Sequence, residues 1–179
     1  MIKRSAGPRK GDRHALVAFL NGVRVGDVYQ SASGTIRFTY EEEWRTNPNS
    51  YPLSLSMPLT AADHSHETIV SFLWGLLPDN ERTLDHYVRL FGVSARNPVA
   101  LLSHIGADCA GAVQFAAPEH AHLLEGPGPR QVTVDWLTEV EVASGLRTVR
   151  NHGIPGTTRR TVGQFSLAGA QPKIALLEE

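Results

Sequence analysis

The order of apolar and polar residues predicts three short strands in the first forty residues. Residues 15–29 form two apolar runs that meet at Asn21 and Gly22. Both central residues of a two-residue hairpin turn need positive φ, which Asn and Gly tolerate, so a β-hairpin is predicted here. In residues 35–40 apolar side chains occupy alternate positions, which gives a third strand one apolar and one solvated face. Two prolines then favour a sheet edge or a loop at residues 52–58.

Helical spacing replaces this alternation in the middle of the chain. Apolar residues recur at i, i+3, i+4 and i+7 over residues 69–76. Pro78 ends this helix, because the residue before a proline avoids the α region. A second helix is predicted to begin after Asp79 or Asn80, which act as its cap, and to stop at Gly92.

Three further elements complete the prediction. Asn97 caps a short helix that starts at Pro98 and ends at Gly106, residues 111–116 form a strand, and residues 135–145 form a last helix. Short helices on a small antiparallel or mixed sheet make an α+β fold.

Composition and charge narrow the class of protein without identifying it. With 179 residues, 41% of them apolar, the chain can bury one sizeable core, or one domain and the start of another. A formal charge of −1 gives no overall attraction to nucleic acid or anionic lipid. Cys109 is the single cysteine, so an internal disulfide is excluded and a reducing compartment is favoured.

The sequence carries no sign of export or membrane insertion. The basic residues near the N-terminus have no apolar run behind them, and no run in the chain approaches the roughly 18 apolar residues of a membrane span. We therefore expect a cytoplasmic protein without a membrane contact, in which residues 1–14 form a flexible basic tail.

The charge pattern changes in the last part of the chain. A loop at residues 125–130 separates this part from the α+β unit. Residues 142–177 contain no Asp or Glu, and a solvated basic linker or a segment ordered by a bound anion both fit this pattern. The basic residues in this span are Arg147, Arg150, Arg159, Arg160 and Lys173.

The strongest candidate for a binding function is the segment SLAGAQPK at residues 166–173. Ala168, Gly169 and Ala170 let backbone N–H groups come close to a ligand, and Lys173 adds a positive charge, which suits a phosphate chain. The expected geometry is strand, loop, strand, unlike the P-loop pattern, which leads into a helix. On composition alone, an ordinary small-residue turn between two strands fits as well.

Two pairs of histidines invite comparison with metal sites. His64 and His66 are two residues apart, as are His120 and His122, so each pair would share one face of a strand. Zinc requires four well-placed ligands, and no cysteine or firm third ligand accompanies either pair. No metal site is predicted, and the histidines are expected at the surface or at helix caps.

Other polar and aromatic residues are expected to have structural roles. Asp79, Asn80 and Glu81 have the composition of an acid–base cluster, but directly before a helix they are expected to cap it. Cys109 lies among small residues without a cationic neighbour, so it is expected to be buried. The tryptophans expected in the core are Trp44, Trp74 and Trp136.

Four blocks of sequence, taken together, resemble the HipA family of bacterial serine/threonine kinase toxins. They are SLSMPL at 54–59, LLPDNE at 76–81, IGADCAGAVQF at 105–115 and SLAGAQPK at 166–173. The blocks occur in the order found in that family, and the resemblance covers most of the chain. It implies a HipA N-terminal subdomain at residues 15–124 and the start of a kinase-like N-lobe with the ATP flap at residues 125–179.

The resemblance also assigns roles to residues of the last block. Ser166 corresponds to the serine that these kinases phosphorylate on themselves, which ejects the flap and silences the kinase; an ordinary strand serine is the alternative. Pro172 occupies a variable position and has no N–H group to contribute. The residues that correspond to the ATP-binding loop are Ala168, Gly169, Ala170, Gln171, Pro172 and Lys173.

Kinases of this family are more than twice as long as this chain, and the resemblance places their catalytic and magnesium-binding aspartates downstream of the flap. The chain is therefore expected to carry no catalytic residue and to be an N-terminal piece of a longer kinase that uses ATP and Mg²⁺. Phosphoryl transfer needs metal ions, an oriented nucleophile and charge neutralisation together. We expect the chain alone to be inactive.

The resemblance implies partners as well. These are a helix-turn-helix antitoxin of the HipB type, through which DNA is contacted indirectly, the remaining kinase lobe, and a protein substrate such as glutamyl-tRNA synthetase, an aminoacyl-tRNA synthetase. A role in bacterial persistence follows from the same resemblance. The alternative is a non-enzymatic interaction subunit that docks on a separately encoded HipA-type kinase core.

Overall fold

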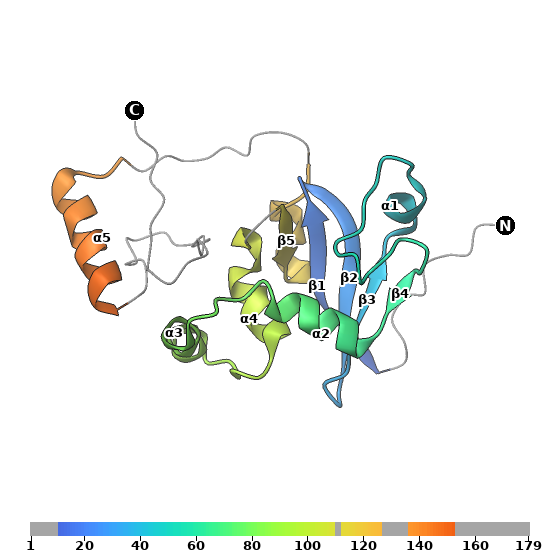
Figure 1. Ribbon diagram of the computed structural model, residues 1–179, viewed down its shortest axis with the longest axis horizontal. Helices are drawn as coiled ribbons and strands as arrows, with labels where there is room; N and C mark the ends of the chain where they lie inside the picture. The colour runs from blue at the N-terminus through green and yellow to red at the C-terminus, as the bar shows by residue number, and fades with distance from the viewer. Residues whose placement is uncertain (1–10, 110–111, 127–135, 153–179) are drawn as a thin grey trace.

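The fold is built on a five-stranded antiparallel sheet in the order β4-β3-β2-β1-β5 (Figure 1). The computed structural model describes residues 11–109, 112–126 and 136–152. Its strands are β1 (Asp12–Leu20), β2 (Val23–Ser31), β3 (Ile36–Tyr40), β4 (Asp63–His64) and β5 (Val113–Ala116). Its helices are α1 (Glu42–Thr46), α2 (His66–Trp74), α3 (Glu81–Phe91), α4 (Pro98–Ile105) and α5 (Glu139–His152), with 3₁₀ turns η1 (Gly106–Asp108) and η2 (Pro118–Leu123). The predicted α+β fold is confirmed.

The predicted hairpin is formed by β1 and β2. Its two turn residues have positive φ, 50° at Asn21 and 78° at Gly22, as the sequence pattern requires. Gly22 also lies against a second segment: the N–H of Gly126 donates to the carbonyl of Gly22 at 3.0 Å, and a Cβ at Gly22 would meet the carbonyl oxygen of Gly126. β1 begins at Asp12, three residues before the expected start of the hairpin.

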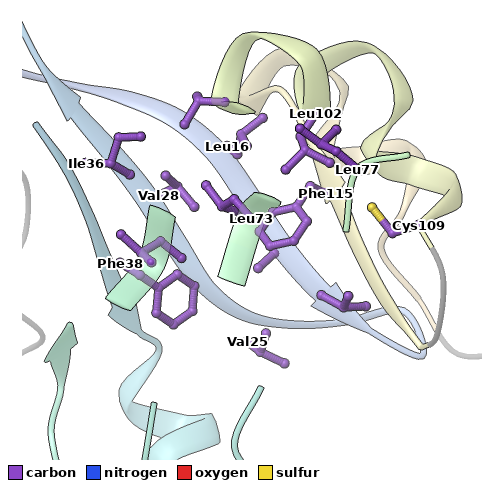
Figure 2. Packing of buried hydrophobic residues seen from close by; sticks show 14 of the residues in the cluster. Leu16, Val25, Val28, Ile36, Phe38, Leu73, Leu77, Leu102, Cys109 and Phe115 are labelled. Atoms are coloured by element: carbon purple, nitrogen blue, oxygen red, sulfur yellow. The ribbon is translucent and has the colours of Figure 1, made fainter. Parts of the chain in front are cut away.

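The main core lies between one face of the sheet and the helices α2 and α4 (Figure 2). Leu16, Val28 and Phe38 come from three neighbouring strands and are fully buried. They belong to alternating sets of strand residues whose side chains point to the core face of the sheet. Phe115 of β5, paired with Ala18 of β1, belongs to the sheet side of this core, and the helices supply the opposite side with Leu73 and Leu102. A smaller cluster on the other face joins Val17 and Phe19 of β1 to Ala116 and Leu124.

Helix ends follow the predicted chemistry. The side-chain oxygen of Asn80 accepts hydrogen bonds from the N–H groups of Arg82 and Thr83, and α3 ends at Gly92 with φ of 64°. Asn97 caps α4 in the same way, with Pro98 at its first position. No helix in the described ranges is long and apolar enough to cross a bilayer.

Several expectations from the sequence need correction. The last helix spans Glu139–His152, whereas residues 135–145 were expected. Trp136, expected in the core, is 61% exposed. Trp44 and Trp74 are half-buried and pack against the core. The short elements α1 and β4 were not predicted, because each is too short to show a periodic pattern of apolar residues.

Candidate functional site

The predicted phosphate loop lies outside the described residues. This holds for Ser166 and for all six residues of the loop, Ala168, Gly169, Ala170, Gln171, Pro172 and Lys173. Four of the five basic residues of the last part, all except Arg147, have no described side chain. The structure does describe the blocks SLSMPL and LLPDNE, and the block IGADCAGAVQF except residues 110 and 111.

The block SLSMPL forms a turn that a buried tyrosine holds in place. The hydroxyl of Tyr40 donates to the carbonyl of Met57 and accepts from the N–H of Leu53, both at 2.8 Å. Burial raises the pKa of Tyr40, so the hydroxyl keeps the proton that it donates. Met57 itself is fully buried, whereas Leu55 at the turn is 96% exposed. One aromatic side chain thus fixes both ends of a turn that presents a leucine to the outside.

The other two blocks contain residues that connect and pack neighbouring elements of the fold. In LLPDNE, Leu77 is buried in the core and Asn80 caps α3. In IGADCAGAVQF, Gly106 lies against β5 so closely that a Cβ would stand 2.7 Å from Cβ of Phe115 and 2.9 Å from its carbonyl oxygen. Cys109 is buried, as predicted. Local packing therefore explains these residues without a ligand.

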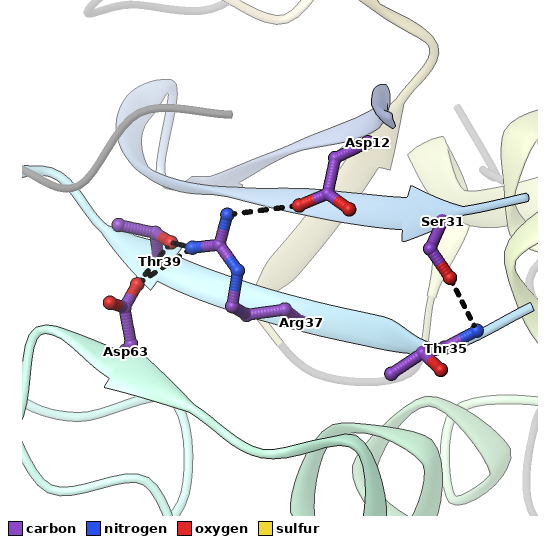
Figure 3. Close-up of polar contacts among 6 residues, drawn as sticks. All are labelled: Asp12, Ser31, Thr35, Arg37, Thr39 and Asp63. Atoms are coloured by element: carbon purple, nitrogen blue, oxygen red, sulfur yellow. Dashed lines mark hydrogen bonds and ion pairs between the residues drawn. The ribbon is translucent and has the colours of Figure 1, made fainter. Parts of the chain in front are cut away.

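A polar cluster occupies the face of the sheet opposite the main core (Figure 3). Arg37 on β3 contacts two carboxylates, Asp63 on β4 at 2.8 Å and Asp12 on β1 at 3.3 Å. The hydroxyl of Thr39 donates to the same oxygen of Asp63 at 2.6 Å. We call Asp12, Arg37, Thr39 and Asp63 the Arg37 cluster.

The Arg37 cluster is more enclosed than the sequence predicts. The alternation in β3 placed Arg37 and Thr39 on a solvated face, but Arg37 is only 8% exposed and Thr39 is buried. The guanidinium group also stands 5.0 Å from the ring centre of Tyr29 on β2, within cation–π range. The one guanidinium group is paired with two carboxylates from neighbouring strands, so we interpret the cluster as a polar contact that joins β1, β3 and β4 rather than a catalytic site.

A cavity of 410 Å³ adjoins the Arg37 cluster at the end of the sheet where β2 turns into β3. Its lining includes serine and threonine residues and the start of α2. The lining residues are Asp12, Ser31, Thr35, Ile36, Arg37, Asp63, His64, Ser65 and His66. In the sequence these residues are scattered over more than fifty positions, and no local motif joins them.

The histidines of the two predicted pairs take structural or surface positions. His64 is buried beside Phe38 and Tyr40, and His66 accepts a hydrogen bond from the N–H of Ile36 at 3.0 Å through Nδ1. His120 and His122 lie exposed on η2. Within the described part of the chain, no three His, Cys, Asp or Glu side chains come close enough to hold a metal ion.

Burial of His64 predicts a loss of stability in mild acid. Its Nε2 atom is buried without a hydrogen-bond partner, and burial lowers the pKa of the ring below 6.5, although Asp63 partly opposes this. Below about pH 6.5 the unfolded chain therefore binds a proton that the folded chain refuses, so the free energy of unfolding falls until the lowered pKa is passed.

Urea denaturation at several pH values would measure this change in the free energy of unfolding. The pH should run from roughly 5 to 8, because histidine titrates in this range. His64→Phe should flatten the acid side of the stability curve, while the matched variant of the exposed His122, His122→Phe, should leave it steep. An unchanged slope in His64→Phe would show that another group controls the acid loss.

Comparison with known proteins places the chain beside a family of kinases. The family model described as the HipA N-terminal domain matches residues 16–116. A putative kinase, Y4mE of Sinorhizobium fredii, is 34% identical over 159 residues, which is 88% of this chain and 36% of the relative. The serine/threonine-protein kinase toxin HipA of Shewanella oneidensis is 35% identical over 159 residues, 88% of this chain and 34% of the relative. The chain thus spans about a third of the length of these curated relatives.

Proposed function

The chain belongs to the HipA family, and from this premise we propose that it forms the N-terminal region of a protein serine/threonine kinase. A HipA N-terminal domain at residues 15–124 is followed by a segment, within residues 125–179, that holds the phosphates of ATP. The observation that carries the proposal is the family match over residues 16–116, with the block SLAGAQPK downstream of it in the same chain.

The packing of the core supports the boundary of the N-terminal domain. Both described core clusters draw all their members from residues between Ala15 and Leu124. α5 contributes to neither cluster. A domain with its own core can act as a separate folding unit, and the part that starts at residue 125 then belongs to the kinase lobe.

In this proposal the phosphate chain of ATP lies against the loop from Ala168 to Lys173. Small side chains allow the backbone N–H groups to approach the phosphates, and the Lys173 ammonium group offsets their charge. In the complete kinase, Mg²⁺ would neutralise the phosphate oxygens further. Ser166, two residues before the loop, is the proposed site of self-phosphorylation, which would add a charge next to the loop.

The experiment that tests the proposal adds the part of a relative that this chain does not span. We define the joined kinase as residues 1–179 fused to the portion of the Shewanella relative that follows its aligned region. With labelled ATP and Mg²⁺, the joined kinase should incorporate phosphate, whereas the 179-residue chain alone should show no transfer above a protein-free sample. The reason is that this proposal places the nucleophile-orienting and metal-binding groups in the added portion.

Two results would count against it. Transfer by the chain alone would mean that it contains catalytic groups that the resemblance does not assign. A joined kinase that is folded by circular dichroism yet binds no ATP would contradict the phosphate-binding role of residues 168–173.

A second function is favoured by the closed core of residues 15–124. Because this domain buries its own apolar face, it can also serve as a non-enzymatic subunit that docks on a separate kinase core. Mixing the chain with the separately purified portion of the relative distinguishes the two: activity in trans supports docking, and activity only in the fusion supports one polypeptide. In either form, the proposed further partners are a helix-turn-helix antitoxin and a protein substrate such as an aminoacyl-tRNA synthetase.

A further inference from the structure

A second cavity, of 430 Å³, lies beside β1 on the side of the strand that faces β5. Its lining comes from β1, from α4 and from the start of η2. None of the lining residues belongs to the Arg37 cluster, and none lies in one of the four sequence blocks. The cavity is therefore a separate feature, which no role assigned above explains.

One edge of β1 is open along this cavity. β1 pairs with β2 from Asp12 to Leu20, but β5 pairs only with residues 17–20. In the described part of the chain, no strand continues β5 along residues 12–16. The reason is local, because the chain turns into η2 at Pro118, and a proline has no N–H to donate to a strand ladder. An open strand edge is a place where another extended chain can pair.

The cavity has a wall on each face of the sheet. On the core face lies α4, whose Val99 is buried in the main core, and Ala15 of β1 packs against the same core. On the other face lies η2, whose Ala121 packs against the smaller cluster that contains Val17. The two walls and the edge of β1 form a slot. Its volume lies in the range of natural ligand sites, about 300–1,000 Å³.

The rim of the slot carries more basic than acidic side chains. Arg13, His104 and His120 line it, together with the single acidic residue Glu119. Arg13 is exposed, and its guanidinium group donates to Oε1 of Gln30 at 2.8 Å. Among the described residues Arg13 forms no ion pair with a carboxylate. A carboxylate on the occupant of the slot can therefore pair with Arg13.

We propose that the open edge of β1 at residues 12–16 binds an extended segment of a partner protein by strand addition, and that an acidic side chain of this segment pairs with Arg13. Backbone N–H and C=O groups supply the hydrogen bonds, and alternate side chains of the added strand enter the slot. Binding of this kind needs neither ATP nor the phosphate loop, so it is independent of the proposed function.

The spacing of residues along the slot defines the segment. A strand that continues the line of β5 runs antiparallel to β1, so its residue opposite Ala15 comes two positions before its residue opposite Arg13. Both side chains then point to the same face. The first meets the apolar wall at Val99, which favours valine, and the second reaches Arg13, which favours glutamate. Five extended residues measure about 17 Å. The peptide TVTET, with both ends blocked, has this pattern.

Fluorescence anisotropy of labelled TVTET, titrated with the 179-residue chain, tests this binding. The matched peptide TVTKT should bind at least about fivefold more weakly, because a repulsion replaces an attraction at an exposed pair. In Arg13→Glu the preference should reverse toward TVTKT. Arg96→Glu changes an exposed arginine outside the cavity and should leave the preference unchanged. TVTET methylated on its backbone nitrogens should lose at least about tenfold in affinity, because it lacks the N–H donors of a strand.

Equal affinity for the two peptides, an unchanged preference in Arg13→Glu, or full binding of the methylated peptide would overturn the proposal. No binding of TVTET at concentrations up to about 1 mM would overturn it as well. The register shift at Ala15 and the charge of Arg13 would then serve only to protect the edge from pairing. Dimers of the chain that Arg13→Glu abolishes would identify a second copy as the occupant instead.

Hydrogen–deuterium exchange of the unaltered chain gives a second measurement if Arg13→Glu disturbs folding. Addition of TVTET should slow exchange in residues 12–16. Exchange in β4, at the other edge of the sheet, should stay the same. Equal slowing at both edges, or no slowing at residues 12–16, would contradict binding at β1.

Discussion

Replacing Gly26 with alanine is expected to destabilise the N-terminal domain by about 3 kcal/mol or more, and replacing it with valine should prevent folding. Gly26 lies on the central strand β2, paired with Ala18 on one side and Tyr40 on the other. A Cβ at this position would meet the ring of Phe38 and the carbonyl oxygen of Thr39. Phe38 is fully buried and the carbonyl belongs to the backbone, so neither can move aside.

The measurement is thermal and urea unfolding of the chain, followed by circular dichroism. A loss of this size should lower the melting temperature of a domain of this size by about 10 °C or more. Gly75→Ala is the matched control, because Gly75 has φ of −65° and its nearest neighbour would be an ordinary 3.4 Å from the new Cβ. A wild-type melting temperature in Gly26→Ala would show that the strands β2 and β3 do not approach as closely as described.

Ser166→Ala in the joined kinase is expected to abolish self-phosphorylation. The alanine removes the acceptor hydroxyl while leaving the backbone of the loop unchanged. Phosphate incorporation, measured with labelled ATP and mapped by mass spectrometry, should fall to the level of a sample without kinase. If modification of Ser166 silences the enzyme, the variant should also phosphorylate an added protein substrate for longer than the parent does.

Two controls make this result specific. Ser54→Ala and Ser56→Ala alter exposed or half-buried hydroxyls of the turn held by Tyr40, remote in sequence from the loop, and should leave labelling intact. Full labelling of Ser166→Ala at another residue would remove the role assigned to Ser166 while leaving the ATP-binding role of residues 168–173 standing.

Local chemistry accounts for most of what the sequence predicted correctly. The hairpin turn at Asn21 and Gly22 depends on the φ preferences of two residues, and the caps Asn80 and Asn97 depend on one side chain and the next turn of helix. Such signals are complete within a few residues. They therefore predict the local structure correctly without knowledge of contacts to distant parts of the chain.

Long-range contacts account for what the sequence did not reveal. Arg37 meets Asp12 and Asp63, which lie 25 and 26 positions away, so nothing near Arg37 distinguishes it from a solvated strand arginine. Trp136 was expected in the core because it lies in an apolar stripe, yet that stripe has no partner among the described elements. An apolar pattern shows that a face needs covering, but it does not say by what.

The candidate phosphate loop likewise could not be identified from local composition alone. Composition alone left residues 168–173 open between a phosphate loop and an ordinary turn, because small residues and one lysine serve both. The family assignment favours the first interpretation. It rests on the match over residues 16–116, which contains the other three blocks, and these have structural roles in the fold. The residues that specify the architecture thus identified the family, and the family in turn points to the loop.

Hydrogen–deuterium exchange of the joined kinase, with and without ATP and Mg²⁺, tests the central claim most directly. If residues 168–173 hold the phosphates through their N–H groups, the peptide that covers them should exchange more slowly with ATP, while the peptides of β1 to β5 stay unchanged. Lys173→Ala should weaken this protection. ATP-dependent protection confined to the added kinase portion, with none at residues 168–173, would contradict the account.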